Sequence, residues 1–137
     1  MPMDAERRAY LESMGLPALD ARGHDLLRKM ALSREWIGKL KAELSNAGEH
    51  VETLKARILL SPAYKESRPN ETIRAAWLLA QQGTDADFAA AIRVYRDFRR
   101  NLDAAEADAE ALEAEYKLVI TEIRLATAEL QFLGGGE

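Results

Sequence analysis

The sequence contains no cysteine, only four prolines, and no long uninterrupted apolar run. The absence of cysteine excludes a disulfide framework and any cysteine-based metal site. No stretch reaches the roughly 18 apolar residues that a transmembrane helix needs. Residues 1–10 carry four charged side chains and no apolar core of the kind found in secretory signals. These absences predict a soluble, cytoplasmic protein with no membrane partner.

The recognised signatures of catalysis are also missing. The sequence has no GxSxG, GxxxxGK[ST], GxGxxG or HExxH motif. The two histidines, His24 and His50, have no neighbours at a distinctive metal-binding spacing, so we interpret both as surface or joint residues. We therefore expect no enzymatic activity, no cofactor, no metal and no small-molecule substrate.

Alanine, leucine, glutamate and arginine dominate what is present, which is typical of long helices and coiled coils. The clearest pattern is a heptad repeat from Phe88 to Leu133, with no proline or glycine before Gly134. Steps of three and four residues meet only apolar or aromatic side chains: Phe88, Ala91, Tyr95, Phe98, Leu102, Ala105, Ala109, Leu112, Tyr116, Val119, Ile123, Ala126, Leu130 and Leu133. A 3.5-residue repeat of this length predicts one long helix that packs against a partner helix.

A second heptad repeat runs from Leu26 to Ile58 and ends before Ser61-Pro62. Its positions are Leu26, Met30, Ser33, Ile37, Leu40, Leu44, Ala47, Val51, Leu54 and Ile58. Only Ser33 is polar, so one helix over about 25–60, or two helices with a joint at Ser33, would both fit. We expect a break before this helix at Gly23-His24.

The remaining segments are shorter. Residues 3–14 predict a helix that Asp4 begins and Gly15 ends. Residues 61–69 predict a turn-rich segment, and Asn70 is expected to cap a short helix over 71–82. The residues Thr84-Asp85-Ala86-Asp87 are expected to begin the long helix. The predicted organisation is an N-terminal helical segment (1–24), a helical hairpin (25–133) with a small helical tip (61–84), and a flexible tail (134–137).

The fold class expected from these elements is all-α: a long antiparallel helical hairpin or coiled coil with short accessory helices. The longer helix extends beyond the shorter one, so its remaining length would pack on residues 1–24 or on another copy. We favour a homo-oligomer, most simply a dimer. Its expected interface comprises Tyr95, Phe98, Leu102, Leu112, Tyr116, Val119, Ile123 and Leu130.

Charge is unevenly distributed along the chain. The net charge is −4 overall, but it is −1 over 1–54, +4 over 55–100 and −7 over 101–137. The basic segment places four arginines near the start of the long helix and three cations in the connecting tip. The candidate nucleic-acid-binding residues are Arg93, Arg96, Arg99, Arg100, Lys65, Arg68 and Arg74. Lys55 and Arg57 are expected at the same end.

Arginine is well suited to bidentate phosphate contacts, and such a cluster favours salt-sensitive binding of nucleic acid without sequence preference. Tyr64 and Trp77 could stack on bases if exposed. The alternative is that these cations are ordinary surface groups that pair with nearby carboxylates, and that Trp77 belongs to the core.

The acidic segment allows two interpretations as well. Its carboxylates are Asp103, Glu106, Asp108, Glu110, Glu113 and Glu115. They encircle most of a helix and no histidine joins them, so we interpret them as a solvated helix flank rather than a metal site. The acidic polar face also argues against a helix that lies on a membrane surface.

The segment 70–76 (NETIRAA), followed by a long Ala/Glu/Leu helix that ends in Thr-Ala-Glu-Leu at 127–130, resembles small helical proteins encoded by bacteriophages and prophages. That resemblance implies a non-enzymatic accessory to phage-type DNA metabolism, located in the host cytoplasm. It assigns no site residue.

Two functional hypotheses follow. The first is a homo-oligomer that binds nucleic acid through its basic tip. The second is a structural or adaptor protein whose apolar heptad seam recruits a helical protein partner, with no nucleic acid involved.

Overall fold

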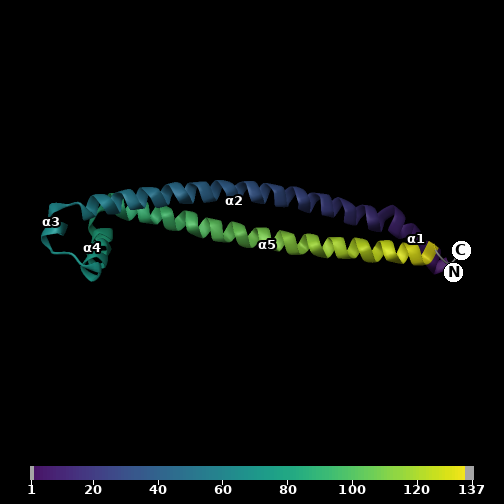
Figure 1. Cartoon of the computed structure of the whole chain (residues 1–137). Coiled ribbons are helices and arrows are strands. Elements are labelled where there is room, and N and C mark those ends of the chain that lie inside the picture. Colours follow the sequence, from purple (N-terminus) through teal and green to yellow (C-terminus); the bar gives the residue numbers. More distant parts are fainter. Residues whose placement is uncertain (1, 135–137) are drawn as a thin grey trace. The chain divides into compact units, whose positions relative to one another are not determined.

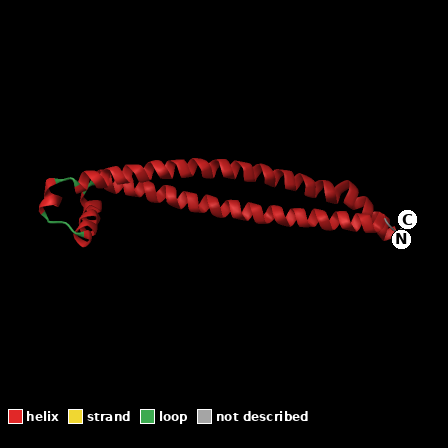
Figure 2. Cartoon of the chain, viewed as in Figure 1, coloured by secondary structure: helices red, strands yellow, loops and turns green. Residues whose placement is uncertain are grey.

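The computed structural model describes residues 2–134, and this part of the chain is all-α, as predicted (Figures 1 and 2). It contains no β-strand. The elements in chain order are α1 (Pro2–Tyr10), a π-helical turn η1 (Leu11–Gly15), α2 (Leu16–Leu59), α3 (Pro62–Glu66), α4 (Glu71–Thr84) and α5 (Ala86–Gly134). Gly134 belongs to α5, and the rest of the predicted flexible tail, residues 135–137, lies outside the described residues.

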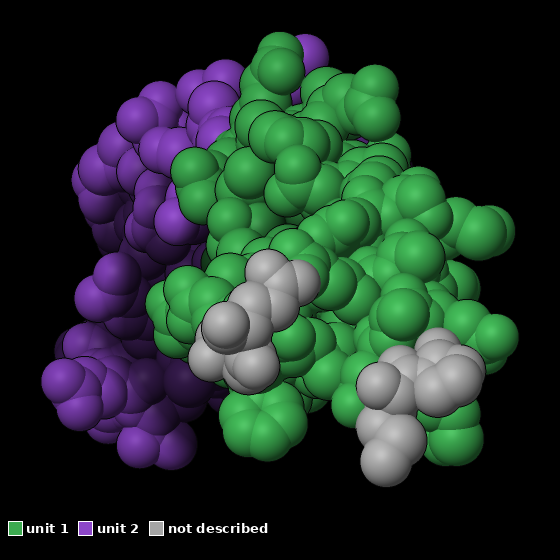
Figure 3. Space-filling view, turned by 90° about the vertical axis from the view of Figure 1, so that its right-hand side faces the viewer, with its two compact units in different colours: residues 1–35, 106–137 green, residues 36–105 purple. Residues whose placement is uncertain are grey.

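The chain divides into two compact units, which Figure 3 shows in different colours. Unit 1 comprises residues 1–35 and 106–137, and unit 2 comprises residues 36–105. Both long helices, α2 and α5, contribute to both units. Each unit therefore joins segments that are distant in the chain.

Unit 2 is built on an antiparallel pairing of α2 with α5. One core cluster joins Val51, Leu54 and Ile58 of α2 to Phe88 and Ala91 of α5. A second cluster contains Leu40, Leu102 and Ala105, with Ile37, Leu44 and Phe98 packed against it. Because residue numbers rise along α2 as they fall along α5 between the two clusters, the helices run in opposite directions.

Unit 1 pairs α1, η1 and the first part of α2 with the second part of α5. Val119 is fully buried, and its Cγ1 lies 3.7 Å from the position that a Cβ on Gly23 would take. Ion pairs cross between the helices, among them Arg22 with Glu115 at 2.8 Å and Arg7 with Glu129 at 3.0 Å. In unit 1, too, the paired helical segments run in opposite directions.

The heptad pattern predicted both seams correctly. Every position assigned to the repeat from Phe88 to Leu133 is buried or half-buried, and so is every position from Leu26 to Ile58. Ser33 is half-buried within α2 and forms no joint, so a single helix is present. The physical reason is that the 3.5-residue spacing keeps one face of each helix against the other.

Two expected breaks near the N-terminus are wrong. Gly15 does not end a helix; it closes a π-helical turn, and the chain continues directly into α2. A Cβ at Gly15 would meet Leu11 Cδ2 at 3.2 Å and Tyr10 Cε1 at 3.3 Å, so these side chains would have to shift by a few tenths of an ångström to admit it. Gly23 does not break the helix either: it is buried on the seam within α2, where a Cβ would make an ordinary van der Waals contact with Val119.

The connecting elements are defined by three N-caps. Ser61 begins α3, a short helix that the sequence analysis missed, and its hydroxyl accepts a hydrogen bond from the backbone N–H of Tyr64 at 3.4 Å. Asn70 caps α4 as predicted, accepting from Ile73 N at 2.9 Å. Asp85 caps α5, accepting from Phe88 N at 3.0 Å. Each cap satisfies a backbone donor at a helix start that has no partner within the helix.

The ion pair between Arg7 and Glu129 should be visible in a titration. The hydrogen bond from Arg7, with the attraction of its charge, lowers the pKa of the Glu129 carboxyl below its ordinary value of 4.5. The ion pair therefore stabilises the folded state when the pH is above the pKa that Glu129 has in the unfolded state. This stabilisation is lost as the pH falls through the lowered pKa that Glu129 has in the folded state. Replacing Arg7 with methionine should raise the pKa of Glu129, because both interactions that lower it come from Arg7; NMR titration of the carboxyl would measure the change.

Arg22→Met is the matched control, because Arg22 pairs with Glu115 instead. This variant should leave the pKa of Glu129 unchanged. A Glu129 pKa that does not respond to Arg7→Met would show that the pair is absent in solution.

Candidate nucleic-acid interface

The candidate interface lies on unit 2, and its central feature is an arginine face on α5 formed by Arg93, Arg96 and Arg100. All three side chains are exposed. At 100° per residue, the spacing i, i+3, i+7 places them on one side of the helix, opposite the seam residues Tyr95 and Phe98. The three Cα atoms span about 10 Å along the helix axis.

The arginine face is only weakly neutralised by carboxylates. Arg100 Nη1 lies 4.0 Å from Asp97 Oδ1, at the limit of an ion pair, in an exposed i, i+3 arrangement. Arg99, on the adjoining side of α5, lies 3.9 Å from Asp103. Within the described part of the chain, Arg93 and Arg96 form no ion pair. Exposed pairs of this kind contribute little in water, so the guanidinium groups stay available to an anion.

The three other predicted cations lie in the segment that connects α2 to α5. Lys65 is exposed on α3 and Arg74 is exposed on α4. Arg68 lies in the loop between them and has a φ of 52°, in the left-handed region. A non-glycine residue in that region is unusual, and Arg68 also precedes Pro69, which disfavours the right-handed helical conformation. Arg68 therefore has an unusual backbone conformation in the loop between α3 and α4.

Arg57, expected among the free cations of the tip, is instead engaged with the start of α5. Its Nη2 lies 3.6 Å from Asp85 Oδ2 and 4.0 Å from Asp87 Oδ2. Asp85 is also the N-cap of α5, so one carboxylate serves both the helix start and the ion pair. Lys55 likewise pairs with Glu52 at 3.1 Å. Both cations are therefore engaged by carboxylates of the same chain and are less available to an external anion.

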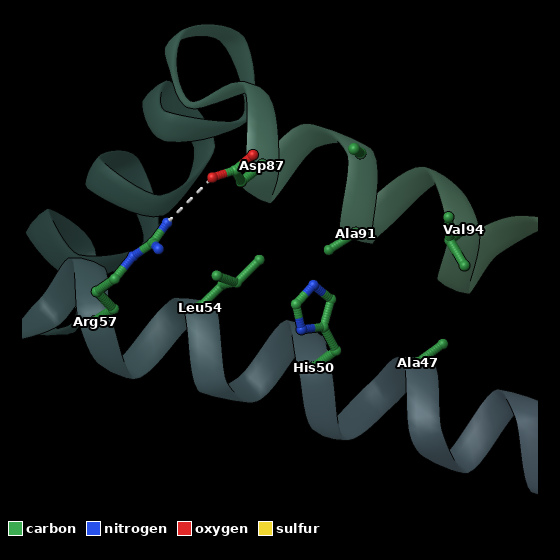
Figure 4. A pocket seen from close by; sticks show the side chains of 8 residues that line it. Ala47, His50, Leu54, Arg57, Asp87, Ala91 and Val94 are labelled. Atoms are coloured by element: carbon green, nitrogen blue, oxygen red, sulfur yellow. Dashed lines mark ion pairs between the residues drawn. The ribbon is translucent and has the colours of Figure 1, made fainter.

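A shallow groove lies beside the Arg57–Asp87 pair (Figure 4). The figure shows His50 between Leu54 and Ala47 on α2, facing Ala91 and Val94 of α5. The walls are mostly alanine, leucine and valine, and the carboxylate of Asp87 is directed toward Arg57 rather than toward the imidazole. The groove therefore presents one histidine without an adjacent acid or nucleophile.

Tyr64 and Trp77 do not present their rings to solvent as base-stacking platforms require. Tyr64 is buried, and its ring packs edge-on against that of Trp77 with centroids 5.7 Å apart and an interplanar angle of 62°. Trp77 packs against the core cluster of Val51, Leu54 and Phe88. These contacts agree with the interpretation of Trp77 as a core residue. Its indole N–H is buried without a hydrogen-bond partner in the described part of the chain.

Two carboxylates of the acidic segment of α5 pair with cations of the same chain. Among residues 2–134, no three histidine, aspartate or glutamate side chains gather in a way that could hold an ion. Glu115 is engaged by Arg22, and Glu113 lies 3.3 Å from Lys117.

The residues predicted to form an oligomer interface lie on the seams within the chain. Tyr95 packs against the first core cluster of unit 2, while Phe98 and Leu102 belong to the second. In unit 1, Val119 is buried, and the other predicted members are half-buried: Leu112, Tyr116, Ile123 and Leu130. Oligomerisation remains a prediction, and an interface between copies would most simply use side chains that the intrachain seams leave exposed.

The fold places the chain in the class of all-α proteins built from long helices that pair through heptad seams. No protein-family model, curated protein or solved structure matches it. Within the described residues, no helix combines the length and the apolar character needed to cross a membrane.

Proposed function

We propose that this protein is a non-enzymatic, helical homo-oligomer that binds nucleic acid through the arginine face, as an accessory to phage-type DNA metabolism. The observation that carries the proposal is the exposure of Arg93, Arg96 and Arg100 on one side of α5 with little neutralisation by carboxylates. Lys65, Arg68 and Arg74, exposed in the connecting segment, would add further phosphate contacts.

Geometry favours a phosphate backbone as the ligand. The arginine face extends for about 10 Å, and duplex DNA carries one negative charge per roughly 1.7 Å of axis, or about six charges over that length. Three guanidinium groups at this spacing can each meet a phosphate without any contact to a base. Binding is therefore expected to be insensitive to sequence and strongly sensitive to salt.

The adaptor hypothesis requires the heptad seam to be available to a helical partner. Within each unit the seam side chains are buried or half-buried against helices of the same chain. Opening the seam would expose the core clusters, so nucleic-acid binding is the better-supported function.

Fluorescence anisotropy with labelled single-stranded and double-stranded DNA tests the proposal. The wild-type protein should bind at about 50 mM salt and lose affinity steeply toward about 200 mM. The triple variant Arg93→Glu/Arg96→Glu/Arg100→Glu should lose at least about a hundredfold in affinity at low salt. Its plot of log affinity against log salt should be shallower by about three, which is roughly one per phosphate contact removed.

The matched control changes three cations elsewhere by the same total charge. Arg28, Arg34 and Lys41 are exposed and lie outside the arginine face. Converting all three to glutamate should reduce affinity far less than the triple variant of the arginine face. Absence of binding at low salt, or equal losses in both triple variants, would refute the proposal.

A further inference from the structure

A second heptad row of apolar and small residues runs along α5 in unit 1, on the side away from the seam. Its members follow the three–four spacing: Ala107, Ala111, Ala114, Leu118, Thr121, Leu125, Ala128 and Phe132. All eight are exposed. Leu118, Leu125 and Phe132 are 64%, 66% and 82% exposed and recur at intervals of seven residues. We call this set the outer row.

The outer row has the length and period of a helix-pairing surface. It covers three and a half heptads and extends for about 38 Å along the axis. Large apolar side chains that stand alone on a surface need no explanation, but three aligned at heptad spacing form a continuous apolar strip. Alanine or threonine at the alternate positions lets a second helix approach closely.

The charges on the two flanks of the outer row are of opposite sign over residues 115–129. One flank carries Glu115, Glu122 and Glu129, and the other carries Lys117 and Arg124, which Glu110 precedes on the same flank. In a parallel, in-register pair of α5 helices, each residue on the second flank faces the acidic residue five positions later in the partner. Lys117 would then meet Glu122 of the other copy, and Arg124 would meet Glu129.

An antiparallel pair would bring each flank against the same flank of the other copy. Glu115, Glu122 and Glu129 would face one another, and like charges at these positions disfavour the pairing. In the parallel arrangement the like charges that meet are confined to the first part of the row, where Glu110 faces Glu115 and Asp103 faces Asp108. Glu115 and Glu129 already accept hydrogen bonds from Arg22 and Arg7, but a carboxylate has acceptor sites for a second cation.

We propose that the outer row of α5 is the interface of a parallel homodimer, in which Leu118, Leu125 and Phe132 of two copies pack together and Lys117 and Arg124 pair with Glu122 and Glu129 of the other copy. This surface is distinct from the seam predicted from sequence, which stays within the chain. It is also distinct from the arginine face, which the dimer would duplicate.

Light scattering coupled to size-exclusion chromatography tests the interface. The wild-type protein should have twice the chain mass of 15.3 kDa. The variant Leu118→Glu/Leu125→Glu should have the mass of one chain at the same concentration, with unchanged far-UV circular dichroism because both side chains are exposed. The matched control, Leu60→Glu/Leu79→Glu, introduces the same charges at two exposed leucines of unit 2 and should remain dimeric.

A charge exchange tests the orientation. Lys117→Glu and Glu122→Lys should each weaken the dimer at least about tenfold, and the double variant should restore it, because the two residues face each other only when the helices are parallel. A wild-type monomer at high concentration would overturn the proposal, and so would a dimer that survives Leu118→Glu/Leu125→Glu. A double variant that does not restore dimerisation would overturn the parallel orientation.

The outcomes of the dimer experiments can be distinguished from those of the DNA-binding experiments. Variants of the arginine face should keep the dimer mass, and monomeric outer-row variants should still bind DNA, with only the gain from bivalent attachment lost.

Discussion

Replacing Phe88 with alanine is expected to lower the free energy of unfolding by about 3–5 kcal/mol. The Phe88 side chain is 0% exposed, and it fills the cluster formed by Val51, Leu54 and Ile58 of α2. Removing the ring leaves a cavity beside rigid helices that can close only in part. Urea unfolding followed by far-UV circular dichroism would measure the change.

Val94→Ala is the control for this prediction. Val94 lies on the same helix, less than two turns later, and is about half exposed. Its truncation should cost less than about 1 kcal/mol, since little buried area is lost. Similar losses for the two variants would mean that the core cluster of unit 2 is not packed as described.

Introducing a carboxylate at Val119 is the second substitution with a large expected effect. Val119 is fully buried in unit 1 next to Gly23. We expect Val119→Asp to destabilise the protein by about 3–5 kcal/mol at neutral pH, as for other unpaired buried charges. Burial would raise the pKa of the introduced carboxyl, so the loss should shrink as the pH falls below that pKa.

Leu118→Asp provides the comparison, because Leu118 is the preceding residue and is exposed. Measured in dilute protein, where association contributes little, it should change the free energy of unfolding by well under 1 kcal/mol. An equal loss at both positions would contradict the assignment of Val119 to the seam.

The sequence was sufficient to predict the helices and the seams, since both depend on a local and regular property. The spacing of apolar residues determines which face of α5 is buried, and the residues from Phe88 to Leu133 follow it without exception. The caps were predictable for a similar reason: the Asn70 and Asp85 side chains bond to backbone groups three residues away. Such interactions need no knowledge of the tertiary fold.

The errors arose where a tertiary contact overrides a local preference. Gly15 and Gly23 resemble helix ends in the sequence, but Gly15 closes a π-helical turn and Gly23 is buried on the seam beside Val119. The short helix α3 was missed because five residues are too few for a periodic signal. The pairing of Arg57 with Asp85 depends on how α2 meets the start of α5, which residue spacing alone does not specify.

The candidate site was predictable in part. Spacing on a helix was enough to group Arg93, Arg96 and Arg100 on one face. It could not show that Tyr64 is buried and packs edge-on against a half-buried Trp77. The outer row is not apparent from the sequence, because the seam repeat on the same helix contains most of the large apolar residues of α5.

The π-helical turn at Leu11–Gly15 makes the chain unequally tolerant of changes in length. A π-helical turn contains one residue more than a turn of α-helix. It therefore places Leu11 and Leu16 on the same side of the helix although they are five residues apart. Deleting one residue there would restore four-residue spacing and leave both on the seam. A deletion in the middle of α2 or α5 would rotate all later side chains by about 100°. Natural variants of this protein that differ in length should therefore differ first at this turn.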